Sequence, residues 1–175
     1  IYVDIDSYDI TREPDVFIYG NTITNPTNPY CYTGINVYGY YANATYIYNN
    51  MISGVDGTGI ILYRSDYTEI HDNVIVNITD YGIYINGVYE GRIYENTIQN
   101  SGDYALYLGS NAEDFYIYRN NFLVDSSYGP YDDGTSNQWW SDSQITYFYN
   151  DTSWTNYTGN YYQWYSDTDS NGDGI

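Results

Sequence analysis

The stretch GRIYENTIQN, residues 91–100, decides the fold because close relatives of it recur along the chain. The other four copies read DVFIYGNTITN, TYIYNNMISG, TEIHDNVIVN and FYIYRNNFLV. Their aligned asparagines are 29, 23, 23 and 24 residues apart, which is too short for a helix-pair repeat, and the copies are rich in β-branched residues. Each repeat is therefore expected to form one turn of a coil of strands. The aligned residues are Asn21, Asn50, Asn73, Asn96 and Asn120.

The asparagine stands where each copy must bend. Ile93 and Ile98 are five residues apart, an odd number, so a straight strand would place them on opposite faces. Asparagine suits a bend because it tolerates left-handed backbone angles and bonds neighbouring backbone groups. Stacked turns would place the five amides above one another, each donating to the next. We expect an internal asparagine ladder at a buried corner, and not a set of ligands.

A second column of short strands precedes the first in every turn. These strands read GINVYG from Gly34, GIILYR from Gly59, GIYING from Gly82 and ALYLGS from Ala105. Alternation points one set of apolar side chains inward, where they stack into a narrow aliphatic core. The predicted inward residues are Ile35, Val37, Ile60, Leu62, Ile83, Ile85, Leu106 and Leu108 from this column, with Ile18, Ile47, Ile70, Ile93, Ile117, Ile23, Ile52, Ile75, Ile98 and Phe122 from the first.

Short strands, about 23 residues per turn, and GIxI followed by IxxNxI resemble the repeats of the NosD-like and pectin-lyase-like families. The resemblance implies an all-β fold, a right-handed parallel β-helix of about five turns over residues 1–131. It leaves function open, because folds of this group carry polysaccharide lyases and hydrolases, carbohydrate-binding surface proteins and an accessory protein of copper-enzyme maturation.

Residues 132–175 break the repeat and are expected to form a Tyr/Trp-rich capping and assembly segment. Its GNYYQW stretch is similar to the GNYW-type sequence that precedes an Asp-rich run at the ends of NosD-like archaeal surface proteins. SQITYFYN is expected to add a strand over the last turn. The four tryptophans, Trp139, Trp140, Trp154 and Trp164, are expected to bury the C-terminal end and flank of the coil.

Composition restricts the partners and the compartment. The net charge is −19 with no Lys and four Arg, so nucleic acid and anionic membranes are poor partners. The single cysteine, Cys31, excludes an intramolecular disulfide framework, and no apolar run is long enough to span a membrane. The chain starts with Ile, which indicates a processed or excised product of an exported, extracellular protein. Four glycosylation sequons agree with this compartment, at Asn43, Asn77, Asn150 and Asn156.

Aromatic residues form an outward file beside the inward isoleucines. At a strand separation of roughly 4.8 Å their rings must stack in an offset manner. A structural role that stiffens the coil and a platform for sugars or for a neighbouring subunit both remain open. Two charged pairs, Glu69 with Arg92 and Glu95 with Arg119, are expected across adjacent turns. The file contains Tyr19, Tyr48, His71, Tyr94 and Tyr118, and Tyr84 with Tyr107 begins a shorter one.

The C-terminal DTDSNGDGI carries alternate oxygen-bearing side chains with glycines that permit a tight wrap. This pattern suits a hard cation of the Ca²⁺ kind and is similar to the first half of an EF-hand, dockerin or thrombospondin-type calcium loop. A flexible acidic terminus is the alternative. The predicted calcium ligands are Asp167, Asp169, Asn171 and Asp173.

Enzymatic and copper functions are less favoured by the residues present. Lys is absent, two Arg have ladder partners, and Asp132 and Asp133 are adjacent in sequence and so diverge, which leaves no catalytic residues to name. His71 is more typical of a ladder member than of a catalyst. Cys31, Met51 and His71 fall on different columns or turns and supply too few soft ligands for copper.

The sequence favours a structural extracellular protein that self-associates end to end into a filament, sheath or surface layer. Ile1, Val3 and Ile5 form an apolar first strand with no capping helix before it, so copies of the chain are the expected partners. The alternative is a carbohydrate-binding or carbohydrate-cleaving β-helix that uses its exposed tyrosine face, with glycans as partners.

Overall fold

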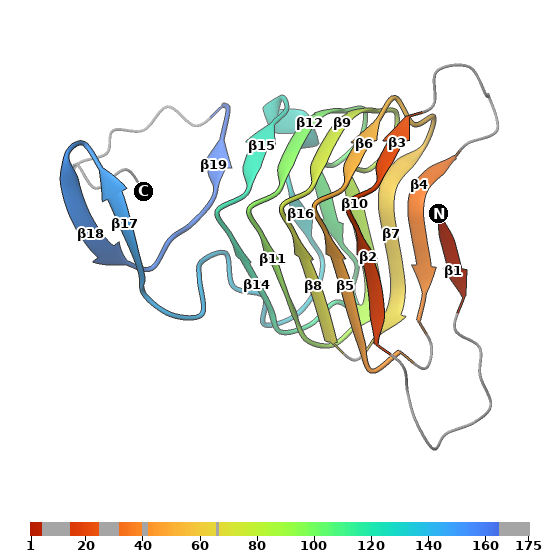
Figure 1. Cartoon of the computed structure of the whole chain (residues 1–175), viewed down its shortest axis with the longest axis horizontal. Coiled ribbons are helices and arrows are strands. Elements are labelled where there is room, and N and C mark those ends of the chain that lie inside the picture. Colours follow the sequence, from red (N-terminus) through yellow and green to blue (C-terminus); the bar gives the residue numbers. More distant parts are fainter. Residues whose placement is uncertain (5–14, 25–31, 40–41, 66, 165–175) are drawn as a thin grey trace.

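In the computed structural model, residues 1–4, 15–24, 32–39, 42–65 and 67–164 are described. The chain coils through three parallel sheets of six, five and six strands, and successive coils lie side by side along the long axis (Figure 1). The first sheet contains β1 (Tyr2–Asp4), β4 (Thr33–Tyr38), β7 (Thr58–Ser65), β10 (Ile83–Val88), β13 (Leu106–Leu108) and β16 (Tyr131–Asp132). The second contains β2 (Val16–Tyr19), β5 (Ala44–Tyr48), β8 (Tyr67–His71), β11 (Gly91–Tyr94) and β14 (Phe115–Tyr118). The third contains β3 (Thr22–Thr24), β6 (Met51–Ser53), β9 (Val74–Ile78), β12 (Thr97–Ser101), β15 (Asn121–Leu123) and β19 (Tyr161–Tyr162).

The predicted all-β parallel β-helix is confirmed. The strand registers place Ile47, Ile70, Ile93 and Ile117 opposite one another, as the aligned repeats require. All the predicted inward residues are buried except Ile23, which is half-buried at the outer strand of its sheet. The predicted count of about five turns is approximate: the first coil is only partly described, the last is irregular, and the solenoid has about four turns.

One detail of the asparagine corner differs from the prediction. The residue in the left-handed conformation is the one before each ladder asparagine: Gly20, Asn49, Asp72, Glu95 and Arg119 have φ between 54° and 67°. The ladder asparagines themselves are not among the described residues with positive φ. The preceding residue makes the turn, which frees the asparagine side chain to point inward and bond.

The predicted boundary at residue 131 falls inside β16, and the chain continues to follow the coil beyond it. Thr135 and Gln138 form parallel bridges with Glu113 and Tyr116, and β19 pairs with β15. A last, irregular coil therefore closes the C-terminal end of the solenoid.

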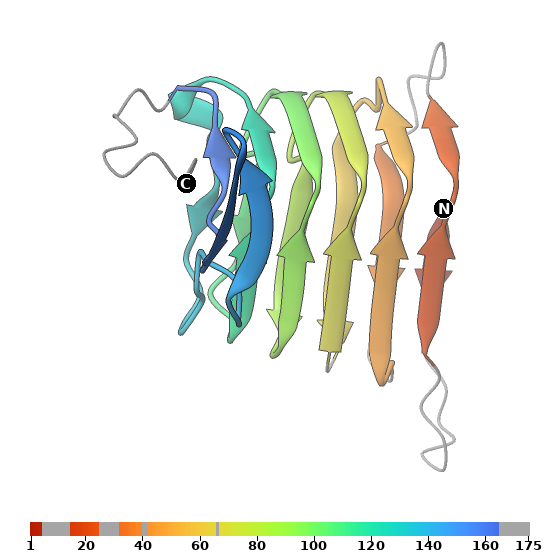
Figure 2. The same ribbon diagram turned by 60° about the vertical axis from the view of Figure 1, so that its left-hand side comes forward.

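The predicted strand SQITYFYN does form, but it does not pair with the coil. β17 (Ile145–Tyr149) pairs with β18 (Thr152–Asn156) as an antiparallel hairpin. The hairpin is inserted into this last coil, and its base is closed where the Ser141 amide donates to the Thr158 carbonyl at 3.0 Å. It lies at the C-terminal end of the stack, away from the first coil (Figures 1 and 2). An antiparallel pair satisfies its own backbone groups, so it does not need the edge of the coil.

The four tryptophans divide between the coil and the hairpin. Trp139 packs against the core, and Trp164 lies against Gly129 and the ring of Tyr162. Trp140 is exposed, and Trp154 donates from its indole to the Tyr149 carbonyl within the hairpin. The expectation that the tryptophans mostly bury the end and flank of the coil therefore holds for Trp139 and Trp164 and is wrong for Trp154, which lies in the hairpin.

Candidate functional site

The five predicted asparagines form a continuous internal column. The Asn73 amide nitrogen lies 2.9 Å from Asn96 Oδ1, and the same spacing joins Asn21 to Asn50 and Asn96 to Asn120. Each amide after Asn21 also donates to a carbonyl of the preceding coil; for Asn73 this is Ile47, at 2.8 Å. Asn50, Asn73, Asn96 and Asn120 are buried, and Asn21 is half-buried at the outer end of the column. The column holds the corner of the solenoid and leaves no amide free for a ligand among its buried members.

A sixth member, Asn160, was missed by the sequence analysis. Its Oδ1 accepts from the Asn120 side chain at 2.9 Å, and its Nδ2 donates to the Ile117 carbonyl at 2.8 Å. The signal was present in GNYY, where Tyr162 follows Asn160 by two residues as Phe122 follows Asn120. The hairpin separates the two asparagines by 40 residues and so hides the period.

The outward file on the second sheet is a continuous stack of five rings. Its four ring pairs have centroids 4.7–5.2 Å apart and interplanar angles of 1–5°: Tyr19 on Tyr48, Tyr48 on His71, His71 on Tyr94 and Tyr94 on Tyr118. The His71 Nδ1 atom is 2.8 Å from the Asp72 carboxylate. His71 thus occupies a ring position within the stack. Burial and the nearby Glu69 carboxylate raise the pKa of Tyr94 to about 12.

The first sheet carries a broader tyrosine cluster, which consists of Tyr81, Tyr84, Tyr104, Tyr107 and Tyr131. Tyr84 stacks on Tyr107 at 5.2 Å, and Tyr107 stacks on Tyr131 at 5.5 Å. Tyr81 meets Tyr84 and Tyr107 edge-on. The predicted shorter file therefore extends to Tyr131 and is widened by rings from the corner beside it.

Both predicted charged pairs are present on the second sheet. Arg92 lies 3.1 Å from Glu69, and Arg119 lies 2.6 Å from Glu95. Arg92 also bonds Asp142 at 2.7 Å, which ties the base of the hairpin to the coil. Burial alone would lower the pKa of Arg92, but the bonds to Asp142 and the neighbouring Tyr67 and Glu69 raise it. Tyr67 donates to Glu69, and burial together with this bond raises the pKa of Tyr67.

The other predicted site residues are placed as follows. Asn43, Asn77 and Asn150 of the sequons are exposed, and Asn156 is half-buried. Ile1 is exposed, whereas Val3 is half-buried, packs against the core and pairs with Val37. Ile5, Cys31 and the predicted calcium ligands Asp167, Asp169, Asn171 and Asp173 lie outside the described residues. The calcium site stays a prediction.

Stacked coils of about 23 residues, with an asparagine column inside and aromatic columns outside, define a parallel β-solenoid repeat protein. The family model described as periplasmic copper-binding protein (NosD) matches residues 7–167, and the chain belongs to that family. Comparisons with curated proteins and with solved structures gave no match. No helix in the described part of the chain is long and apolar enough to cross a membrane.

The described residues do not fit a copper centre. Copper prefers imidazole, thiolate and thioether ligands. Within the described ranges, no three His, Cys, Asp or Glu residues gather into a group that could hold a metal ion. His71 is stacked between two tyrosines on the second sheet, and Met51 is an exposed residue of the third. The copper binding named in the family's description therefore has no matching set of donor side chains among the described residues.

Proposed function

We propose that this chain is a non-catalytic, extracellular structural module that self-associates end to end. The observation that carries the proposal is the outer edge of the first coil. β1, β2 and β3 are the outermost strands of their sheets, and β1 and β2 present exposed aromatic rings. Tyr2, Phe17 and Tyr19 are 67%, 56% and 58% exposed.

The Phe17 and Tyr19 rings are exposed because each has a described stacking partner on one side only. Phe17 lies 4.9 Å from Tyr46, and Tyr19 lies 5.0 Å from Tyr48, while no described ring covers their outer faces. One coil further along the chain, Tyr46 and Tyr48 are half-buried. A second copy that continued the stack would supply the absent ring contacts, each stabilising by about 0.5–1.5 kcal/mol.

The opposite end offers matching strand edges. β16 and β19 are the outermost strands of the first and third sheets, and the hairpin emerges beside the second. A first coil docked there would extend two sheets, with the exposed Phe148 and Tyr149 of the hairpin available to contact the neighbour. Such a contact joins different surfaces of the two copies, so it produces a filament unless its rotation closes a ring.

Sedimentation velocity over a series of protein concentrations tests the proposal. The wild-type chain is expected to form species that grow with concentration, and the double variant Phe17→Asp, Tyr19→Asp is expected to remain monomeric. Tyr89→Asp is the matched control, because Tyr89 is 58% exposed but lies outside the first coil. A wild-type chain that sediments as a monomer at high concentration, with Ca²⁺ present, overturns the proposal.

We further propose that Ca²⁺ binds at Asp167, Asp169, Asn171 and Asp173 and relieves part of the −19 charge that opposes association. Titration calorimetry with Ca²⁺ compares the whole chain with a truncation after Tyr165. The whole chain is expected to release or absorb heat on binding Ca²⁺, and the truncated chain is expected to show none. Equal heats from both chains, or no heat from either, would contradict the proposed calcium site.

Carbohydrate binding on the tyrosine cluster is the second candidate function. Flat, solvent-facing rings can pack against the C–H face of a sugar while their hydroxyls bond its oxygens. The specific observation is the breadth of the cluster, where Tyr81 and Tyr104 widen the stacked file of Tyr84, Tyr107 and Tyr131. Tyr107→Ala would abolish glycan binding at this surface and leave self-association unchanged.

A further inference from the structure

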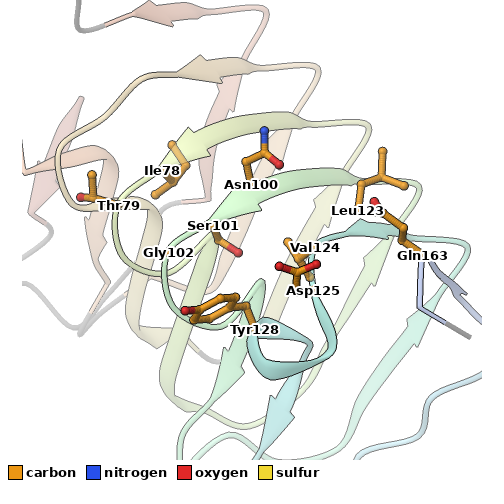
Figure 3. A pocket seen from close by; sticks show the side chains of 10 residues that line it. All are labelled: Ile78, Thr79, Asn100, Ser101, Gly102, Leu123, Val124, Asp125, Tyr128 and Gln163. Carbon is orange, nitrogen blue, oxygen red and sulfur yellow. The ribbon is translucent and has the colours of Figure 1, made fainter.

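A pocket of about 510 Å³ lies at the corner that follows the third sheet, and none of its described lining residues belongs to either aromatic surface. It is lined by the ends of β9 and β12, the segment between β15 and η1 (Ser126–Tyr128), and Gln163 (Figure 3). This volume falls within the range of pockets that hold small molecules.

Ser101 breaks the apolar pattern at the floor of this pocket. The register pairs it with Ile78 of the preceding coil, so a hydroxyl occupies a position that is aliphatic one coil earlier. Ser101 is only 6% exposed, and its Oγ atom has no hydrogen-bond partner among the described residues. Figure 3 shows the side chain directed toward the Val124–Asp125 segment across the pocket. A buried unpaired hydroxyl costs roughly 1–3 kcal/mol, which a ligand hydrogen bond would offset.

Other polar groups surround this hydroxyl. Asp125, Asn100 and Gln163 line the pocket with a carboxylate and two amides. The Asn100 Nδ2 atom donates to Asn77 Oδ1 at 3.1 Å, which leaves the Asn100 carbonyl oxygen available as an acceptor. The exposed ring of Tyr128 forms one wall, and its backbone is fixed by a 2.7 Å bond from the Ala105 amide to the Tyr128 carbonyl.

We propose that this pocket binds one or two residues of a neutral glycan. Among the described residues that line it, Asp125 is the one charged side chain and none is a cation, so a phosphate or a carboxylate ligand would be repelled. Carboxylate and amide acceptors pair with ligand hydroxyl donors, and the Ser101 hydroxyl both donates and accepts. The Tyr128 ring and the nearby Leu123 and Val124 side chains suit the C–H face of a sugar. This inference rests on other residues than self-association does, because neither Phe17 and Tyr19 nor the strands β16 and β19 belong to the lining of the pocket.

Saturation-transfer NMR of the full chain tests the proposal. The probes are the methyl glycosides of glucose, galactose, mannose and N-acetylglucosamine, with maltose, cellobiose and chitobiose. At least one probe is expected to bind, with Asp125→Asn and Tyr128→Ala each raising its Kd by about tenfold, the effect of losing a charged hydrogen bond or a ring contact. Glu90→Gln and Tyr89→Ala are the matched controls, since both residues are exposed and lie outside the pocket.

Ser101→Ala separates a binding role from a structural one. The substitution is expected to weaken sugar binding and to leave the melting temperature equal or higher, because the hydroxyl has no partner to lose and its removal relieves the cost of burying it. A lower melting temperature with unchanged binding would make Ser101 structural and overturn the proposal. Three other results also overturn it: no probe binds, the pocket variants bind as the wild type does, or choline, as a cationic probe, binds where the sugars do not.

Discussion

The side chain of Asn73 uses both its donors and its acceptor inside the solenoid. Its Nδ2 atom lies within 3.0 Å of the Asn96 side-chain oxygen and the Ile47 and His71 carbonyls. Its Oδ1 accepts from the backbone and side-chain amides of Asn50. A carboxylate could not donate, and an aliphatic side chain could do neither, so only an amide of this length satisfies the corner.

Replacing Asn73 with Leu is expected to lower the free energy of unfolding by about 1–3 kcal/mol for each buried group left unpaired. The Ile47 carbonyl and the Asn50 backbone amide lose the Asn73 side chain as a partner in this variant. Urea denaturation followed by circular dichroism measures the change. Gln99→Leu is the control, because Gln99 is an exposed amide on a neighbouring coil. Equal stability of the two variants would show that the column contributes nothing to stability.

Alkaline pH is expected to destabilise the solenoid through its tyrosines. The pKa of Tyr94 is raised from 10.0 to about 12 because burial and nearby carboxylates disfavour the phenolate. The stabilisation that follows from this shift is complete below pH 10, where both states are protonated, and is lost as the pH rises toward 12. Unfolding measured from pH 9 to about pH 12 should show a shallower loss of stability in Tyr94→Phe than in the wild type. Parallel curves would contradict the assignment.

At the scale of the elements, the repeat predicted the strands and their registers because equivalent residues of successive coils pack in the same way. Ile70 and Ile93 occupy the same inward position in successive coils, and the turn that follows each of them also recurs. The hairpin could not be predicted as an insertion, because Ser141 and Thr158, which close its base, belong to no repeated pattern. Asn160 was missed because the inserted hairpin separates it from Asn120 by 40 residues, which hides the period of the repeat. The pocket depends on which side chains converge at a corner, and a linear motif does not encode that.

The hairpin is expected to be dispensable for the fold of the coil. Replacing residues 142–157 with two glycines removes the surface ion pair between Asp142 and Arg92, which contributes about 0–1 kcal/mol. Asn160→Leu is the comparison, because it removes the last member of the asparagine column and should cost more. Thermal unfolding ranks the two variants. A hairpin deletion that melts below Asn160→Leu would mean that the hairpin holds the last coil together.

At the scale of the whole molecule, the two ends of the solenoid differ. The C-terminal end is closed by an irregular coil that buries Tyr118 and pairs Asn120. The first coil instead presents Tyr2, Phe17 and Tyr19 to solvent. A net charge of −19 opposes contact between copies, so association should require salt or a bound cation; screening becomes effective beyond about 10 Å at 0.1 M salt.

Electron microscopy of the purified chain at high concentration, in moderate salt with Ca²⁺, tests the central claim of end-to-end association most directly. The account predicts unbranched filaments one solenoid wide, with density repeating along the axis at about 4.8 Å for each stacked coil. The Phe17→Asp, Tyr19→Asp variant should show single short particles under the same conditions, and Tyr89→Asp should form filaments as the wild type does. Wild-type fields that contain only single short particles would contradict it.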